Sequence, residues 1–199
     1  MSSLTGRIEQ LRQDILSDPP RISVYREMPF AIFRYNPEDE WILRSETQNL
    51  AIQLRNAGKN VVIFSMEKIL WQILEKIEEE NPGEGRLGGL IDQEKFEGFS
   101  NMQEQIVTYL SDEEYCPLSS YIEEKLNALN PKQDIGFLVH VGALGPHFYQ
   151  VSKLLDELQG RVAVTTILFY PGSLEEPHGL RFMDMHDRPA TGGYRVKIY

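Results

Sequence analysis

The chain has 199 residues, of which 41% are hydrophobic and 25% charged, as expected for one globular domain with a full core. Its formal net charge of −10 disfavours direct nucleic-acid binding, because contacts to phosphates usually need a basic face. The single cysteine excludes a disulfide framework or a cysteine-rich zinc site within the chain. No apolar run approaches the roughly 18–20 residues of a membrane span, and residues 1–10 contain no apolar signal core, so we expect a cytoplasmic protein.

The negative charge is concentrated in the middle of the chain. Residues 67–114 contain thirteen acidic and four basic residues, whereas residues 178–199 contain four basic and two acidic residues. A solvated acidic face that aids solubility is the simplest interpretation of the first segment. The second segment could present a small positive patch.

The N-terminal residues predict a helix followed by a strand. Apolar residues recur at helical spacing over residues 4–16, and two prolines stop the helix soon after. We therefore expect residues 1–20 to form an N-terminal helical arm. The short apolar run at residues 30–35 predicts the first core strand.

The stretch "YNPEDEW" has the features of a helix start. Asn36 can cap the helix, and Pro37 suits its first position. The three acidic residues that follow complement the helix dipole. An apolar face continues from there to Gly58, which is a natural C-terminal stop.

Strand and helix patterns alternate along the rest of the chain. Apolar runs predict further strands at residues 60–65, 135–141 and 162–170. Apolar stripes predict helices at residues 66–77, 100–111, 117–129 and 148–158. The Gly/Glu-rich residues 81–100 predict a mobile loop. Two shorter strands, at residues 180–184 and 194–199, are expected to pair as a hairpin at or near one edge.

This alternation, with nearly continuous apolar strands, predicts a mostly parallel central sheet with helices on both faces. The fold class we expect is a single α/β domain over residues 1–199, a three-layer Rossmann-like or P-loop-like domain. It lacks a phosphate-binding loop, because no G-x-x-x-x-G-K-[ST] or G-x-G-x-x-G pattern occurs. Gly142 and Gly145 follow a strand without a lysine, so we interpret them as a tight turn.

Signals for catalysis are weak. The nucleophile-elbow pattern G-x-S-x-G is absent. Imidazoles and carboxylates cluster within residues 175–187 and could bind a metal, although their spacing matches no known ligand pattern. We therefore expect solvated loop residues there. The cluster comprises Glu175, Glu176, His178, Asp184, His186 and Asp187.

Three arginines could either brace the structure or contact a ligand. Arg44 lies four residues after Glu40, which allows a salt bridge on the helix or an arginine held at the strand ends for an anion. Arg181 and Arg195 raise the same question near the end of the chain. A guanidinium at a sheet edge usually braces loops through its five donors, so we expect bracing.

Four stretches of the sequence together resemble one known family. The first, "FRYNPEDEWILR", has a short strand, a Tyr-x-Pro-x-x-Glu turn and a helical arginine, at Tyr35, Pro37, Glu40 and Arg44. The second, "FLVHVGALGPHF", has an apolar strand, a Val-Gly turn and a Pro-aromatic pair. Both are similar to segments of the BrxB family of BREX bacteriophage-exclusion systems.

The other two stretches lie in the last third of the chain. "FYPGSLEEPHGLRF" resembles that family's Phe-Tyr-Pro-Gly turn followed by Leu-Arg, at Tyr170, Pro171, Gly172, Leu180 and Arg181. "GGYRVKIY" is similar to its Tyr-Arg ending, at Tyr194 and Arg195. The residues after Arg181 depart from the family's usual Leu-Phe-Gly. The resemblance extends from Phe30 to Tyr199.

The resemblance implies a role in phage defence, without an enzymatic reaction or a cofactor. BrxB proteins are understood as non-catalytic components encoded with a large ATPase, a DNA methyltransferase and the PglZ phosphatase-like protein. The expected function is an adaptor that binds a larger partner such as PglZ. The alternative is a metal- or nucleotide-dependent enzyme or regulatory module that uses the 175–187 loop or the Gly142 turn.

The end of the fourth predicted strand gives a specific structural expectation. Pro171-Gly172 is predicted to make a turn there. The alternating run "LRFMD" predicts that Leu180 points into the core and that Arg181 faces the opposite way, within reach of the turn. We interpret the resulting surface as one for a protein partner.

Overall fold

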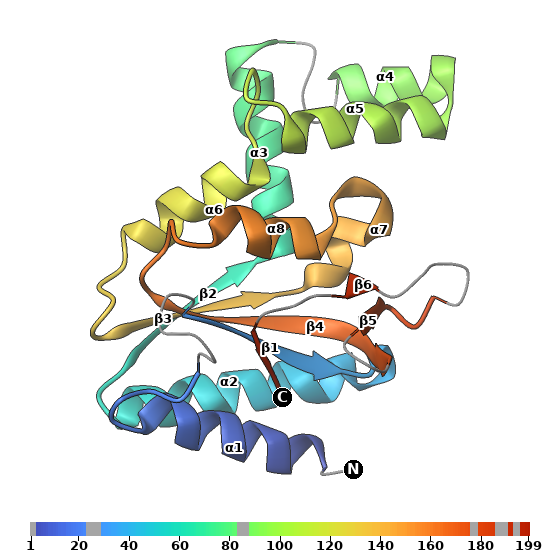
Figure 1. The fold of residues 1–199 in the computed structure, drawn as a ribbon. Coiled ribbons are helices and arrows are strands. Elements are labelled where there is room, and N and C mark those ends of the chain that lie inside the picture. The colour runs from blue at the N-terminus through green and yellow to red at the C-terminus, as the bar shows by residue number, and fades with distance from the viewer. Residues whose placement is uncertain (1–2, 23–28, 83–87, 176–178, 186–190, 193–195) are drawn as a thin grey trace.

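The computed structural model describes residues 3–22, 29–82, 88–175, 179–185, 191–192 and 196–199. It has an α/β fold with a mostly parallel central sheet, which confirms the predicted fold class (Figure 1). The main sheet has the strand order β2-β3-β4-β1-β7, and each neighbouring pair is parallel. These strands are β1 (Phe30–Tyr35), β2 (Asn60–Ser65), β3 (Asp134–Val139), β4 (Thr165–Glu175) and β7 (Lys197–Ile198).

Strands β1 and β2 have the predicted bounds. Strand β3 ends two residues earlier than predicted, because His140 has a left-handed backbone with φ of 57°. That conformation turns the chain out of the sheet. The 3₁₀ helix η2 (Val141–Leu144) and the short helix α7 (Gly145–Phe148) follow.

Helices cover both faces of the sheet, which gives three layers (Figure 1). One face is covered by α1 (Leu4–Leu16) and α2 (Glu40–Asn56). The other is covered by α3 (Met66–Glu80), α6 (Leu118–Asn127) and α8 (Val151–Leu158). Within β1, Ala31, Phe33 and Tyr35 pack on the side of α1 and α2, while Phe30 and Ile32 pack on the opposite side. This is the period-two alternation of a strand buried on both faces.

Helix α1 is held against the sheet and does not form a separate arm. Leu11 and Ile15 are buried in the same core as α2. Asp14 accepts hydrogen bonds from Lys197 Nζ at 2.5 Å and from the Tyr199 hydroxyl at 2.8 Å. The first helix is therefore tied to the strand that ends the chain. Among the described residues, no helix combines the length and apolarity that crossing a bilayer would need.

The predicted loop over residues 81–100 is wrong for much of its length. Helix α4 spans Gly88–Glu97, and α5 (Phe99–Ser111) follows after Gly98. The two helices form a hairpin that extends away from the sheet (Figure 1). Two glycines at the start of α4 cost little helix stability at that position, and burial of Leu90 supports the helix. Tertiary packing thus outweighs the low helix propensity that predicted a loop.

The predicted turn at Pro171-Gly172 is also wrong, because β4 continues through it to Glu175. Pro171 pairs with Tyr35 of β1, and its carbonyl accepts a hydrogen bond from the Met183 amide at 2.9 Å. From Gly172 onward, β4 pairs antiparallel with β5 (Gly179–Phe182). A proline has a φ that is compatible with an extended strand. Pro171 is the last residue of β4 that pairs with β1, and Gly172 is the first that pairs with β5.

The two short C-terminal strands do not pair with each other as predicted. Strand β5 pairs with β4 and with β6 (Thr191–Gly192), whereas β7 pairs with β1 in the main sheet. The two short apolar runs near the C-terminus thus belong to different parts of the structure: one to the antiparallel extension and the other to the edge of the main sheet. The antiparallel extension projects beyond the carboxyl end of the parallel sheet.

Replacing Gly172 by alanine should destabilise the protein strongly. Gly172 has φ of 145°, and a Cβ there would lie 1.9 Å from the Arg181 carbonyl oxygen. We expect Gly172→Ala to lower the free energy of unfolding by about 3 kcal/mol, and the melting temperature by about 6–12 °C. Gly58→Ala is the control, since its φ is also positive but nothing lies within 4 Å of its Cβ; it should cost about 1 kcal/mol. Equal effects of the two substitutions in thermal unfolding would contradict this close contact.

Candidate functional site

The carboxyl ends of β1, β3 and β4 meet at a crevice in the surface. Two adjoining cavities of about 170 and 250 Å³ lie there, and both are lined by Tyr35, Glu40, Arg44 and His140. Helix α2, which follows β1, covers one face of the sheet, while the helices that follow β3 cover the other. Open α/β sheets bind ligands where the connections diverge in this way. We therefore take this crevice as the candidate functional site.

Three residues of the predicted motif form one hydrogen-bonded group in the crevice. The Tyr35 hydroxyl donates to Glu40 Oε2, and Arg44 Nε donates to Glu40 Oε1 at 3.1 Å. The 3₁₀ turn η1 (Pro37–Asp39) brings Glu40 back beside Tyr35, and helical spacing then places Arg44 over Glu40. Burial, together with the neighbouring Glu40 carboxylate, raises the pKa of Tyr35 well above its usual range. Tyr35 is therefore a neutral hydrogen-bond donor at physiological pH.

Asn36 does not cap the helix as predicted. Its side chain makes no hydrogen bond to a helical amide. Its Oδ1 instead accepts from the Arg34 guanidinium at 2.7 Å. Pro37 does occupy the first position of η1 and lines the larger cavity.

His140 is a site residue that the sequence reasoning did not identify. Its Nδ1 lies 2.9 Å from the hydroxyl of Ser65 at the end of β2, and its Nε2 lies 4.0 Å from Glu40 Oε1. Burial and the nearby Arg44 guanidinium lower the pKa of His140, although Glu40 and Glu67 oppose the shift. The imidazole is therefore neutral at physiological pH. The available signal was a polar residue inside an otherwise apolar run that predicted a strand.

Thr47 contributes a second unexpected feature of the crevice. It lies on α2 and is 5% exposed, and its hydroxyl lines the smaller cavity without a hydrogen-bond partner. The walls around it are apolar. They comprise Leu43, Ile63, Val139 and Phe169. An unpaired buried hydroxyl is costly, and such groups often mark functional sites.

Backbone strain is concentrated at the same place. Among the described residues, the non-glycine residues with positive φ are His140, Met183 and Asp184. His140 and Met183 line the larger cavity, and Asp184 Oδ1 is buried without a partner. Left-handed non-glycine residues cluster at functional sites because surrounding structure must hold them there.

The predicted orientations of Leu180 and Arg181 agree with the structure, but the contacts of the arginine differ from the prediction. Leu180 is fully buried. Arg181 lies on the opposite side of β5 and donates to Glu175 Oε1 at 2.5 Å and to the Met185 carbonyl at 2.9 Å. Its guanidinium thus braces the β4–β5 hairpin, not a turn at Pro171-Gly172.

The remaining predicted residues fall into three groups. Pro171 lines the larger cavity together with Gly142. Tyr170 is buried on the opposite face of the sheet from Tyr35, where its ring packs edge-on against Phe182. The third group lies outside the described residues and comprises Glu176, His178, His186, Asp187, Tyr194 and Arg195. In the described part of the chain, no three histidine, cysteine, aspartate or glutamate side chains come together as a metal site would need.

Replacing Thr47 by valine should stabilise the protein. Valine keeps the shape of threonine and removes the unpaired buried hydroxyl. We expect the free energy of unfolding to rise by about 1 kcal/mol and the melting temperature by about 2–4 °C. Thr108→Val on the exposed face of α5 is the control, because that hydroxyl donates to the Glu104 carbonyl. A loss of stability in Thr47→Val, measured by chemical denaturation, would mean that the hydroxyl has a partner.

Comparison with known proteins gives one match. No curated protein and no solved structure matches the chain. A model of the family BrxB, described as BREX protein BrxB, matches residues 62–196. This span covers more than half of the chain and includes His140, Pro171 and Arg181, whereas Tyr35, Glu40 and Arg44 precede it. The chain therefore belongs to the BrxB family of BREX phage-defence components.

Proposed function

We propose that this protein is a non-catalytic adaptor in a cytoplasmic BREX anti-phage complex, where it binds a larger partner such as the PglZ phosphatase-like protein. Family membership supplies the phage-defence context. The adaptor role is supported by the side chains around the strand-end crevice. The partner contacts this crevice and the exposed residues at its edge.

The observation that carries the proposal is the exposure of Trp41 beside the crevice. Trp41 is 77% exposed on the first turn of α2, and the Arg44 guanidinium lies 4.9 Å from its ring centroid. Arg44 is itself held by Glu40. Tryptophan and arginine are enriched among residues that dominate binding energy at protein interfaces. Trp41 is solvent-exposed and its ring is fixed in position by Arg44, so it is best explained as a contact for a partner protein.

A further exposed apolar residue lines the crevice. Met183 is partly exposed and lines the larger cavity with Pro37 and Pro171. Leu174, in the β4–β5 hairpin, is also exposed. Arg181 braces that hairpin, so the apolar rim is held in a fixed shape. Preorganisation of this kind lowers the entropic cost of binding.

An enzymatic or regulatory function is the second candidate, because Ser65 and His140 lie within hydrogen-bond distance. A nucleophile beside a base is the usual arrangement for covalent catalysis. Two features oppose it here. Ser65 lines neither cavity, and the 4.0 Å between His140 and Glu40 exceeds a hydrogen bond. The Gly142 turn borders the larger cavity. A regulatory ligand bound in that cavity is therefore the second form of this alternative.

Substitution of Trp41 tests the adaptor role. We expect Trp41→Ala to reduce co-purification of PglZ from cells that carry the whole BREX system about tenfold or more, and to weaken phage defence. The melting temperature should change little, since Trp41 is mostly exposed. Trp71→Ala on α3 is the matched control, because that residue is partly exposed on the other side of the sheet. Wild-type recovery of PglZ with Trp41→Ala, or no recovery with the wild type, would contradict the proposal.

Assays of the purified protein test the enzymatic alternative. We expect no hydrolysis of ATP, p-nitrophenyl acetate or bis-p-nitrophenyl phosphate, and no thermal shift of several degrees with nucleotides or divalent metals. Turnover that Ser65→Ala and His140→Ala both abolish would establish an enzyme. A thermal shift that Thr47→Val abolishes would instead indicate a regulatory ligand in the crevice.

A further inference from the structure

A second recessed surface lies in the helical hairpin of α4 and α5. Figure 1 shows this hairpin extending from the sheet on the side opposite α1 and α2. A groove of about 400 Å³ runs between the two helices and the segment after α5. None of its lining residues lines the strand-end cavities. The groove is thus a separate feature from the candidate site already described.

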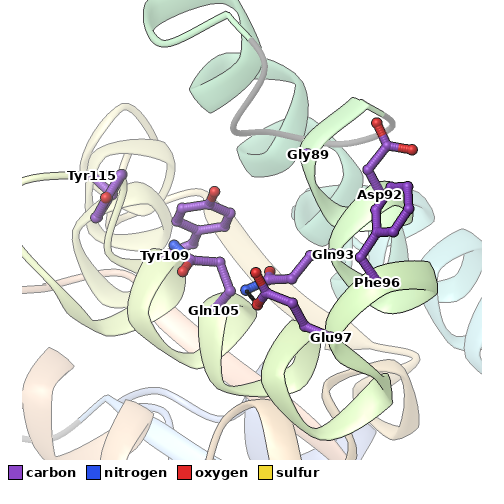
Figure 2. Close-up of a pocket in the computed structure, with 8 residues that line it drawn as sticks. All are labelled: Gly89, Asp92, Gln93, Phe96, Glu97, Gln105, Tyr109 and Tyr115. Carbon is purple, nitrogen blue, oxygen red and sulfur yellow. Dashed lines mark hydrogen bonds between the residues drawn. The ribbon is translucent and has the colours of Figure 1, made fainter.

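The lining of the groove combines aromatic rings with carboxylates. Tyr109 and Tyr115 pack edge-on with ring centroids 4.9 Å apart, and in Figure 2 they lie at the opposite end of the groove from Phe96. The carboxylates are those of Asp92 and Glu97. An aromatic face beside a carboxylate suits a guanidinium group, which can stack on the ring and bind the carboxylate through two N–H groups.

The polar side chains of the groove are already oriented. Gln93 Nε2 donates to Glu97 Oε2 at 3.1 Å. Figure 2 shows Gln93, Glu97 and Gln105 pointing toward one another between the helices. The ion pair of Asp92 with Lys95 spans 3.6 Å and is well exposed, so it competes only weakly with an incoming cation. A carboxylate held in place loses less freedom when a ligand binds.

Phe96 adds an apolar contact at the end of the groove. It is 84% exposed, the largest exposure among the described large hydrophobic side chains. Phe99, at the start of α5, is 56% exposed. Exposed apolar residues next to a recess are typical of protein-binding surfaces. The occupant should therefore present an apolar side chain as well as a cation.

The charge of the surrounding sequence selects the class of partner. Residues 67–114 contain thirteen acidic and four basic residues. A segment with this excess of negative charge repels the phosphates of nucleic acids and attracts basic protein segments. Charge complementarity thus favours a basic polypeptide over DNA or RNA.

We propose that the α4–α5 groove binds a partner protein through an arginine flanked by an apolar side chain. The guanidinium binds a carboxylate that lines the groove, Glu97 or Asp92, and stacks on an aromatic ring. The apolar neighbour contacts Phe96. This surface is additional to the strand-end crevice, and together they would let one adaptor hold two segments or two proteins.

The test uses the full chain and a short fluorescein-labelled peptide in which arginines alternate with leucines. Fluorescence anisotropy should show saturable binding that weakens as salt is raised. The Asp92→Asn/Glu97→Gln double variant and Phe96→Ala should each weaken binding about tenfold. The lysine version of the peptide should bind less tightly, because lysine cannot make the planar fork. Glu104→Gln is the matched control, since this exposed α5 carboxylate does not line the groove; it should change affinity less than about twofold.

Several outcomes would overturn the proposal. Equal binding of all variants, or equal binding of a glutamate-containing peptide, would show that the groove does not recognise a cation. Self-association of the wild type that Phe96→Ala abolishes would assign the groove to a second copy of the chain. Trp41→Ala separates this result from the adaptor proposal, because it should leave peptide binding unchanged. Peptide binding without any recovery of PglZ would support the proposed groove and contradict PglZ as the partner. Recovery of PglZ without peptide binding would support the adaptor role and contradict the proposed groove.

Discussion

The parallel pairing of β1 with β4 is the interaction on which the rest of the structure depends. Six consecutive residues of β1, Phe30 to Tyr35, pair with Thr166 to Pro171, and the paired strands are almost completely buried. This pairing joins segments more than a hundred residues apart. It also sets Tyr35 beside Pro171, so the start of α2 meets the β4–β5 hairpin. Pairing of β3 with β4 then adds His140 to the same edge.

The crevice that results is a connected group of neutral and charged side chains. Glu40 is shared by the Tyr35 hydroxyl and the Arg44 guanidinium, and burial keeps Tyr35 and His140 uncharged. These hydrogen bonds tie the end of β1 to the first turn of α2, which carries Trp41. The motif therefore fixes the position of that turn relative to the sheet.

The strand-end crevice and the α4–α5 groove differ in the kind of contact that they offer. The crevice is lined by both apolar and polar side chains, and the exposed Trp41 is next to Glu40, which lines it. The groove has carboxylates and aromatic rings on a hairpin that extends from the sheet. Two acidic residues of the middle of the chain, Asp92 and Glu97, line this groove.

Local sequence patterns determined much of the fold and the first part of the site. Apolar runs predicted β1 and β2 to the residue, and the "YNPEDEW" start with helical spacing placed Glu40 and Arg44 together. These features depend on neighbours within about one helical turn, which the sequence displays directly. Leu180 in the core follows from strand alternation for the same reason. The family resemblance added Tyr35 and Pro171, and both line the larger cavity.

Only the tertiary structure decided the contacts between distant segments. The sequence places a proline and a glycine after an apolar run, which usually signals a turn, but pairing with Tyr35 and Arg181 keeps β4 extended. The glycine-rich start of α4 is helical in the structure, where Leu90 is buried in the core cluster that also includes residues of α5. His140 lies within a predicted strand and Thr47 within a predicted helix, and neither stands out until β1, β3 and α2 are packed together. Strand pairing and burial act between residues far apart in sequence. A local sequence pattern therefore does not determine which distant segment a strand or helix will contact.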